Sequence, residues 1–357
     1  MPQPSEADRR YMAMALALGE RGLGRVWPNP SVGCVLVRGG KVVGRGWTQP
    51  PPGNHGEVEA LRRAGEHALG ATAYVTLEPC CHYGRTPPCT MALIHAGVRR
   101  VVVAAADPFP RVDGRGIEQL RQSGIQVDVG LMREEAELQH AGFFTKVGKN
   151  RPLVTLKLAM SLDGRIATAS GESQWITGLR ARTSGHGLRA SHDAIMVGAN
   201  TAREDDPSLT CRLAGMEDRS PVRIVVSRGG RLPLESKLAE TAKTHPTWMI
   251  VASGMPAEAL LAHEKAGVEI IRIGGDAEDE RLDLSLALNA LAERGITRLL
   301  VEGGAALSAS LLRARLVDRL SAFQAPVALG GDALPALGAL AIDRLADAPA
   351  FERKATE

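Results

Sequence analysis

Three segments that lie apart in the chain each supply one side chain of a metal-binding type, and this constrains the fold more than any other feature. His55 stands where a loop of glycine, proline and asparagine turns into a helical pattern, Cys80 follows a short predicted strand, and Cys89 opens the next helix. Helix N-termini carry partial positive charge and favour the thiolate form of cysteine. We therefore expect the fold to bring two helix starts and one strand end together around a cation.

One imidazole and two thiols form a ligand set that suits zinc and leaves a fourth position open for water. Glu57 lies two residues after the imidazole, where a carboxylate can carry protons without binding the metal. An H-x-E segment followed by a P-C segment is typical of zinc hydrolytic deaminases, although here the second thiol comes nine residues after the first instead of three. The pattern predicts that a zinc-activated water attacks a ring carbon bearing an amino group, while Glu57 passes the water's proton to the departing ammonia.

A structural zinc knot is the alternative reading of the same cysteines. Such a site needs a fourth protein ligand, which Cys81 or His82 can supply. Glu57 favours the catalytic interpretation, because a structural site has no use for it. The isolated Cys34 and Cys211 are expected to be core cysteines.

Residues near these motifs are candidates for holding a substrate. Asn29 lies on a stiff loop between two prolines and can read the edge of a ring. His82, Arg85 and Thr86 lie in the long insert between the two thiols, and Arg85 suits a phosphate group. The alternative for each of them is a solvated loop residue.

Composition limits the classes of protein to consider. A chain of 357 residues is long for one core, so two domains are expected. A net charge of +3 and an aromatic content of 3% give no support for binding nucleic acid or a membrane. No run approaches the roughly 18 apolar residues that span a bilayer, and the clustered cysteines do not form a disulfide framework. A cytoplasmic location is expected.

Strand and helix patterns alternate along most of the chain. In the first part we expect strands over 32–37, 41–46, 74–77, 99–105 and 125–129, and helices over 8–22, 57–68, 90–96, 117–123 and 133–143. After a polar break at 149–152 we expect strands over 153–158, 194–197, 222–226, 247–251, 269–273 and 298–301, and helices over 179–191, 256–266 and 284–293. Such alternation predicts two mostly parallel α/β sheets, in domains of residues 1–148 and 149–357.

The residues of the second half indicate a function less strongly. Glu302-Gly303-Gly304-Ala305 follows a strand and opens a helix, where backbone N–H groups can meet a phosphate. The G-x-G-x-x-G pattern of a standard dinucleotide fold is missing. Trp175 lies in a polar loop and either stacks on a ring or packs at a domain edge. Four arginines are expected to be solvated surface charge: Arg180, Arg182, Arg219 and Arg223.

Longer motifs resemble a known family. They are Pro28-Asn29-Pro30-Ser31-Val32-Gly33-Cys34, residues 78–89, Lys157–Gly164, Gly171–Thr177, Asp205–Thr210 and Val301–Gly304. Together these stretches resemble the bifunctional riboflavin-biosynthesis deaminase/reductase family over almost the whole chain. The resemblance implies a cytidine-deaminase-like α/β/α sandwich followed by a dihydrofolate-reductase-like α/β domain. It also implies Zn2+ and NADPH as cofactors, phosphoribosylaminopyrimidine substrates, and a dimer or tetramer.

The resemblance also implies roles for single residues of the second half. On the cofactor side it places Ala159, Trp175, Thr201, Asp205, Ser227, Gly304, Ala305, Ala306, Leu307, Ser308, Ala309 and Ser310. On the substrate side it places Lys157, Ser173, Arg189, Leu209, Arg212 and Glu302. Arg189 and Arg212 would clamp a phosphate, and Lys157, Asp205 and Glu302 would orient the ribose and handle its protons.

The chain departs from the family pattern at four places. Gly56 stands where the family usually has alanine, and Phe109 stands where asparagine is common. Val226 replaces the aspartate that usually precedes Ser227, and Val327 stands where lysine is common. None of these departures removes a residue assigned to chemistry. The competing function, a nucleic-acid or nucleoside deaminase with an unrelated second domain, requires for nucleic acid a basic groove with stacking aromatics, which this composition does not favour.

Overall fold

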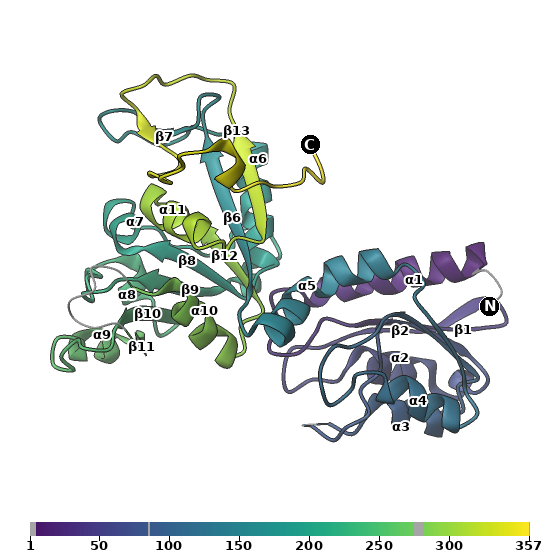
Figure 1. The fold of residues 1–357 in the computed structure, drawn as a ribbon. Helices are drawn as coiled ribbons and strands as arrows, with labels where there is room; N and C mark the ends of the chain where they lie inside the picture. Colours follow the sequence, from purple (N-terminus) through teal and green to yellow (C-terminus); the bar gives the residue numbers. More distant parts are fainter. Residues whose placement is uncertain (1–4, 85, 275–281, 357) are drawn as a thin grey trace. The chain divides into compact units, whose positions relative to one another are not determined.

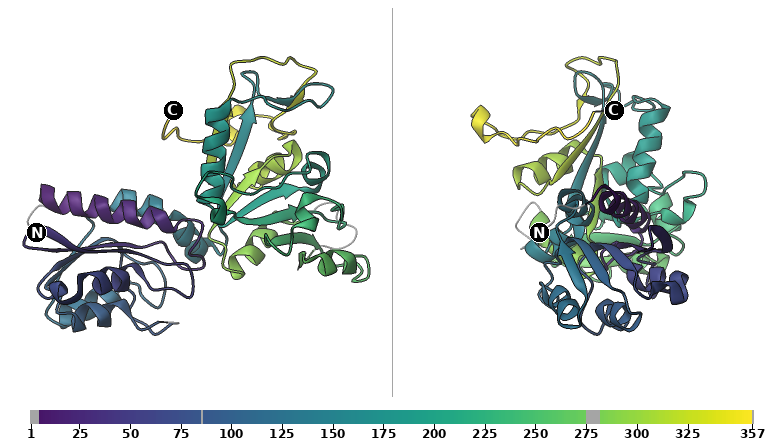
Figure 2. Two further views of the ribbon diagram at one scale, coloured as in Figure 1. Left: turned by 180° about the vertical axis from the view of Figure 1, so that it is seen from behind. Right: turned by 90° about the vertical axis from the view of Figure 1, so that its right-hand side faces the viewer.

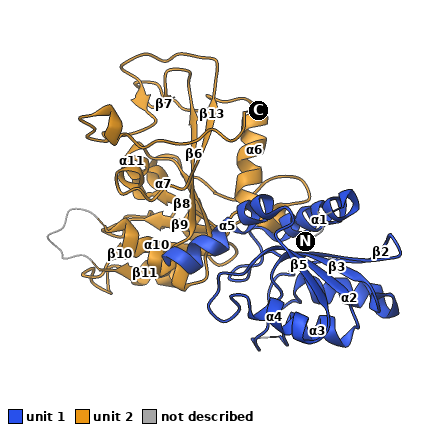
Figure 3. Cartoon of the chain, turned by 45° about the vertical axis from the view of Figure 1, so that its right-hand side comes forward, with its two compact units in different colours: residues 1–150 blue, residues 151–357 orange. Residues whose placement is uncertain are grey.

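The protein folds as two compact units, residues 1–150 and 151–357, which Figure 3 shows in different colours. The computed structural model describes residues 5–84, 86–274 and 282–356. The first unit ends with α5 (Arg133–Lys149), whose C-cap Asn150 has a left-handed φ of 50°. The domain boundary expected after residue 148 falls in the last turn of this helix. No helix in the described ranges has the length and apolarity that a bilayer crossing requires.

The first unit is a three-layer α/β/α sandwich around a five-stranded sheet of order β2-β1-β3-β4-β5. Its strands are β1 (Gly33–Arg38), β2 (Lys41–Trp47), β3 (Thr72–Leu77), β4 (Arg100–Ala105) and β5 (Gln126–Val129). The helix α1 (Glu6–Gly19) lies with α5 on one face of the sheet (Figures 1 and 2). The other face carries α2 (Gly56–Ala64), α3 (Cys89–His95) and α4 (Arg115–Gln122). Short 3-10 turns, η1 (Glu20–Gly22) and η2 (Gly65–Ala68), extend α1 and α2.

The sheet of the first unit is mixed, so the prediction of a mostly parallel sheet is wrong here. β1 pairs antiparallel with both β2 and β3, and only the β3–β4 and β4–β5 pairs are parallel. The predicted hairpin explains the reversal, because Gly39 and Gly40 both have positive φ, as a two-residue hairpin turn requires. The crossover through α2 then returns the chain in the direction of β2. β3 therefore runs opposite to the β1 strand beside it.

The second unit contains a seven-stranded sheet of order β11-β10-β9-β8-β12-β6-β13 in which every pair is parallel, as predicted. Its strands are β6 (Leu153–Met160), β8 (Ala194–Gly198), β9 (Val222–Val226), β10 (Thr247–Ala252), β11 (Glu269–Ile273), β12 (Arg298–Glu302) and β13 (Arg319–Gln324). Its helices are α6 (Leu179–Ala190), α7 (Ala199–Glu204), α8 (Lys237–Glu240), α9 (Leu261–Ala266), α10 (Leu284–Glu293) and α11 (Ala305–Arg313). A small ladder joins β7 (Arg165–Ala167) to β14 (Leu334–Pro335), and 3-10 turns occupy η3 (Glu217–Arg219) and η4 (Leu345–Asp347).

Parallel strands end at a common edge, and this determines where the second unit can bind a ligand. β12 lies between β8 and β6, although it follows both in the sequence. Glu302 at the end of β12 is therefore in register with Lys157 on β6. The loops that follow β6, β8, β9 and β12 all start from this edge.

A buried polar network fastens α1 to the sheet of the first unit. Asp8 is 7% exposed and accepts hydrogen bonds from the Tyr74 hydroxyl at 2.7 Å and from Arg100 Nη1 at 2.8 Å. Burial alone would raise the pKa of the Asp8 carboxyl, but the bonds from Arg100, Tyr74 and Ser5 outweigh burial and hold that pKa well below its usual range. The ionised carboxylate is therefore the form that stabilises the fold.

We expect Asp8→Asn to lower the free energy of unfolding of the first unit by about 1 to 2 kcal/mol at pH 7, since Arg100 keeps its second partner Asp128 and is partly hydrated. The folded pKa of Asp8 lies below the unfolded one. Its contribution is therefore complete above the unfolded value of about 4 and disappears as the pH falls further. Calorimetry of wild type and variant from pH 7 to pH 3 measures the difference. A gap that stays constant to pH 3 would contradict this account.

Candidate functional site

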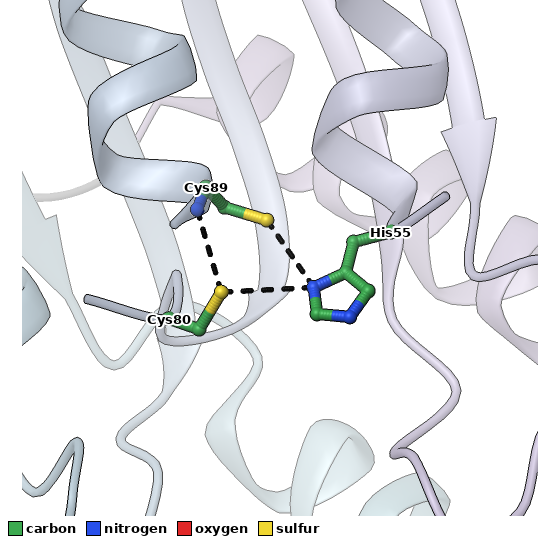
Figure 4. A group of neighbouring side chains, drawn as sticks. All are labelled: His55, Cys80 and Cys89. Atoms are coloured by element: carbon green, nitrogen blue, oxygen red, sulfur yellow. Dashed lines mark hydrogen bonds between the residues drawn. The ribbon is translucent and has the colours of Figure 1, made fainter. Parts of the chain in front are cut away.

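The three predicted metal ligands meet at one point of the first unit (Figure 4). His55 Nδ1 lies 3.6 Å from Cys80 Sγ and 3.3 Å from Cys89 Sγ. Within the described ranges, His55, Cys80 and Cys89 form the one group of at least three histidine, cysteine and acidic side chains close enough to share a metal ion. The prediction that three separate segments converge is confirmed.

The spacing of the ligand atoms fits zinc. Bonds of about 2.3 Å to sulfur and about 2.05 Å to nitrogen at tetrahedral angles place the two ligand atoms about 3.5 to 3.6 Å apart. The two N–S separations bracket this value within 0.3 Å. The chemistry of the donors agrees, since hydrogen bonding with Cys89 lowers the pKa of the Cys80 thiol and favours its thiolate. Side chains already placed at zinc spacing need little rearrangement to bind the ion.

Local structure explains the position of each ligand. His55 is the N-cap of α2, and Cys89 is the first residue of α3. The backbone N–H of Cys89 donates to Cys80 Sγ at 3.3 Å, so the start of α3 orients the thiol that follows β3. A Cβ atom on Gly56 would lie 2.5 Å from the Val32 carbonyl oxygen. The departure from the family pattern at this position therefore allows the start of α2 to approach β1.

Glu57 lies beside the ligands in the first turn of α2 and is 3% exposed. Burial raises the pKa of its carboxyl to about 7, and the nearby Cys80 thiolate adds to this shift. A carboxyl with a pKa near neutrality can both accept a proton from water and release it to a leaving group. This is the property that the predicted proton carrier requires.

The candidates for a fourth protein ligand point elsewhere. Cys81 Sγ lies 3.6 Å from the Arg111 carbonyl oxygen, and His82 Nδ1 faces the Tyr83 carbonyl at 3.4 Å. Neither belongs to the group of ligands found among the described residues. The arrangement thus favours the three-ligand catalytic site over the structural knot.

A cavity of about 470 Å³ is lined by His55, Cys80 and Glu57. The predicted substrate residues Asn29 and His82 line it, together with Phe109, whose ring centroid lies 5.8 Å from that of His82. Arg85, the predicted phosphate contact, lies outside the described residues. Lining residues that the sequence analysis did not assign include Glu78, Asp107, Arg111 and Lys146. Burial raises the pKa of the Asp107 carboxyl to about 7.

The second unit brings Lys157, Arg189 and Glu302 together at the carboxyl edge of its sheet. Arg189 grips the Glu302 carboxylate with Nε at 2.8 Å and Nη2 at 2.9 Å, and Lys157 Nζ lies 3.6 Å from Glu302 Oε2. Burial alone would raise the pKa of Glu302, but Arg189 and then Lys157 more than offset it and lower the pKa. Glu302 is therefore an anchored, ionised carboxylate at neutral pH.

The predicted cofactor residues Thr201 and Gly304 are neighbours. A Cβ atom on Gly304 would lie 3.1 Å from Thr201 Oγ1, so the start of α11 passes close to α7. Within α11 the side chains of Leu307, Ser308 and Ala309 are buried. The Ser308 N–H already donates to the Gly304 carbonyl at 3.1 Å, so the free backbone N–H groups of this segment come before residue 308.

The remaining predicted residues of this unit differ in exposure. Trp175 is 67% exposed, with the Arg182 guanidinium 4.7 Å from its ring centroid, and Asp205 ends α7. Ala159 on β6 and Ser173 are half-buried. Ser227 is buried and accepts the backbone N–H of Arg231 at 2.7 Å, so its hydroxyl holds a turn.

The loop before β9 carries the other two predicted substrate residues. Leu209 is buried with a φ of 53°, and the exposed Arg212 donates to Ser208 Oγ at 2.6 Å. The expectation that Arg223 is solvated is wrong, because its side chain is fully buried. Its guanidinium finds neutral oxygen acceptors, among them Thr241 Oγ1 at 2.8 Å and the His245 carbonyl at 2.8 Å, and these replace water.

Comparisons with known proteins give the family. The model of the cytidine and deoxycytidylate deaminase zinc-binding region matches residues 5–105, and that of the RibD C-terminal domain matches residues 152–350. The riboflavin biosynthesis protein RibD of Aquifex aeolicus is 43% identical over 325 residues, covering 91% of this chain and 88% of that protein. The chain belongs to the RibD family. RibD of Escherichia coli K12 is 42% identical over 367 residues, covering 97% of this chain and 95% of the relative.

Solved RibD structures share the fold. Acinetobacter baumannii RibD superimposes with a TM-score of 0.85 at 39% identity, covering 96% of this chain and 92% of that one. A Thermotoga maritima protein described as a diaminohydroxyphosphoribosylaminopyrimidine deaminase/5-amino-6-(5-phosphoribosylamino)uracil reductase has a TM-score of 0.81 at 34% identity, covering 95% and 93%. The predicted two-domain α/β class and the resemblance to this family are confirmed. The alternative of a deaminase with an unrelated second domain is wrong, because residues 152–350 match the RibD C-terminal domain.

As a RibD family member, the chain is an enzyme of riboflavin biosynthesis with a deaminase and a reductase domain. The first domain is of the zinc-binding type, and the His55, Cys80 and Cys89 group agrees with this. The second matches the RibD C-terminal domain. Zinc is therefore supported as a cofactor of the first domain.

Neighbouring cysteines allow a matched test of the metal site. Cys89→Ser should lower the zinc content from about one ion per chain to well below half, because it removes one of three protein ligands. Cys81→Ala should leave the zinc content unchanged, since its sulfur points to the Arg111 carbonyl. Metal analysis of the two purified variants measures both. If Cys81→Ala lost its zinc, the result would favour the structural site with four protein ligands.

Proposed function

We propose that residues 1–148 deaminate 2,5-diamino-6-(5-phosphoribosylamino)pyrimidin-4(3H)-one with zinc. Residues 149–357 then reduce the ribosyl chain of 5-amino-6-(5-phosphoribosylamino)uracil to ribityl with NADPH. The observation that carries the first reaction is a three-ligand set at zinc spacing with the buried Glu57 beside it, at a cavity large enough for a small molecule. Family membership and the anchored Glu302 support the second reaction.

In the deaminase, His55, Cys80 and Cys89 hold the metal, and the residues around it supply proton transfer and orientation. Zinc, when bound, lowers the pKa of a water molecule to near 7. Glu57 would hold a proton taken from the attacking water and pass it to the amino nitrogen that leaves as ammonia. Its buried position keeps the carboxyl away from bulk water, so the same proton is available for the leaving group.

The cavity wall supplies groups for the rest of the substrate. Asn29 offers both a donor and an acceptor for the pyrimidine edge, and His82 beside Phe109 offers a ring face. Arg111 and Lys146 are cations on the lining, and we assign them, with Arg85, to the ribose phosphate. A neutral pocket would have to desolvate the phosphate without compensation.

In the reductase, we assign Lys157 and Glu302 to the ribose oxygens whose protons move during the reduction. NADPH, when bound, would supply the hydride. Glu302 occupies the Nε and Nη2 side of Arg189, so this arginine acts first as the holder of the carboxylate. The phosphate contact then falls mainly to the exposed Arg212. The N–H groups of Gly304 and Ala305 at the start of α11, and Thr201 beside them, are assigned to NADPH, as are Ala159, Trp175 and Asp205.

A cytoplasmic location and assembly into a homodimer or homotetramer belong to this proposal. Both rest on the sequence analysis and the family resemblance. The formal net charge of +3 gives no support for a nucleic-acid partner. Light scattering of the purified protein measures the assembly state.

Glu57→Gln should reduce the rate of ammonia release from the diaminopyrimidine by about 100-fold or more, because an amide cannot carry the proton. Zinc content should stay at about one ion per chain, since Glu57 is not among the ligands. NADPH oxidation on the already deaminated substrate should also be unchanged. A variant that releases ammonia at the wild-type rate would remove Glu57 from the mechanism.

Glu302→Gln should show the opposite pattern. NADPH oxidation should fall by about 100-fold or more, because the change removes the ionised carboxylate that Arg189 and Lys157 orient. Ammonia release and zinc content should match those of wild type. Parallel assays on the two successive substrates measure both effects, and a shared loss of both activities would argue against two separate sites.

A further inference from the structure

Glu78, two residues before Cys80, has no part in the chemistry described so far. Its side chain is buried, yet it accepts four backbone hydrogen bonds. Oε2 accepts from the N–H of Asp107 at 3.2 Å and of Gly114 at 3.1 Å. Oε1 accepts from the N–H of Gly116 at 2.9 Å and of Ile117 at 3.1 Å.

These four bonds occupy the hydrogen-bond acceptor sites of the Glu78 side chain. A carboxylate has about four lone-pair sites, and four N–H donors fill them. Hydrogen bonds to an ionised acceptor are also about twice as strong as neutral ones. The carboxylate therefore acts as a fixed anchor.

The anchored segment is a wall of the deaminase cavity. Glu78 binds the segment at its start, Asp107, and again at 114–117, where α4 begins. Between these points lie Phe109, Pro110, Arg111 and Val112, and all four line the cavity. Both ends of this wall are thus held by the side chain of Glu78, which lies two residues before Cys80 in the chain.

Packing makes the connection rigid. The Asp107 carboxylate in turn accepts the N–H of Phe109 at 2.8 Å, so the first bend of the wall is fixed from both sides. A Cβ atom on Gly116 would collide with the carbonyl oxygen of Pro79, the residue between Glu78 and Cys80. The start of α4 is therefore in direct backbone contact with the segment that carries Cys80.

We propose that Glu78 is a positioning residue of the deaminase that sets substrate affinity by fixing residues 107–117 relative to the Cys80 ligand. This inference rests on the proposed deaminase function. Since the wall carries Arg111 and Phe109 but no metal ligand, Glu78 acts on the binding of the diaminopyrimidine. Proton transfer and metal retention depend on other residues.

Glu78→Gln tests the proposal in the full-length zinc enzyme. The glutamine oxygen can keep two N–H donors, but its amide nitrogen faces the other two with hydrogens of its own. We expect KM for the diaminopyrimidine to rise by about tenfold or more, as the loss of charge-assisted bonds implies, while kcat changes by less than about threefold. Zinc content and NADPH oxidation should equal those of wild type. Amide exchange should accelerate within 107–117.

Two further variants make the result specific. Glu118→Gln removes the same charge from an exposed position on α4, and its KM should stay within about twofold of wild type. Gly116→Ala keeps the Glu78 carboxylate but pushes the wall away from Pro79, so it should raise KM as Glu78→Gln does. If Glu78→Gln does not fold, the Gly116→Ala result decides.

Three outcomes would overturn the inference. They are an unchanged KM in a zinc-loaded Glu78→Gln enzyme, a loss of activity that merely follows a loss of zinc, and an unchanged KM in Gly116→Ala. Failure of the proposed function itself looks different, because wild-type enzyme would then release no ammonia from the diaminopyrimidine.

Discussion

The deaminase half depends on holding one strand end and two helix starts within a few ångströms of each other. His55 ends the β2–α2 connection, while Cys80 and Cys89 lie at the two ends of the β3–α3 connection. The β2–α2–β3 crossover places the start of α2 against the sheet, and the Cys89 N–H bond to Cys80 Sγ ties α3 to the end of β3. The spacing of the ligand atoms thus depends on the packing of the whole sandwich. A substitution that disrupts the sheet would therefore also change the distances between these atoms.

The two domains differ in where the positive charge of the site comes from. In the first, neutral and thiolate ligands gather to receive a cation whose charge organises the reaction. In the second, the cations Lys157 and Arg189 share the single carboxylate of Glu302 at the edge of a parallel sheet, so the cluster keeps a formal charge of +1. The first site would gain its positive charge from zinc, while the second carries positive charge on its own side chains.

Patterns local in sequence predicted the fold well, and long-range contacts account for the errors. Residue type and spacing predicted three features: the Gly39-Gly40 hairpin, the helix starts at His55 and Cys89, and the second unit that begins after the polar break at 149–152. The direction of the strands in the first sheet could not be predicted in this way. It depends on which strand β3 pairs with after the α2 crossover, and β3 pairs with β1 instead of β2. Arg223 looked like a surface charge because its oxygen acceptors come from residues up to 24 positions away. Glu78 gave no signal for the same reason, since its partners lie 29 to 39 residues downstream.

Gly56 bears on how this enzyme can be engineered. Stabilising a protein by adopting the residue most common among relatives assumes that the local backbone is shared. Here an alanine at position 56 would bring a methyl group to 2.5 Å from the Val32 carbonyl oxygen, next to His55 in the chain. A design that introduced alanine there as a helix-favouring residue would have to displace the start of α2 or the Val32 backbone. For this chain the atypical residue is the compatible one, and a consensus library should leave position 56 untouched.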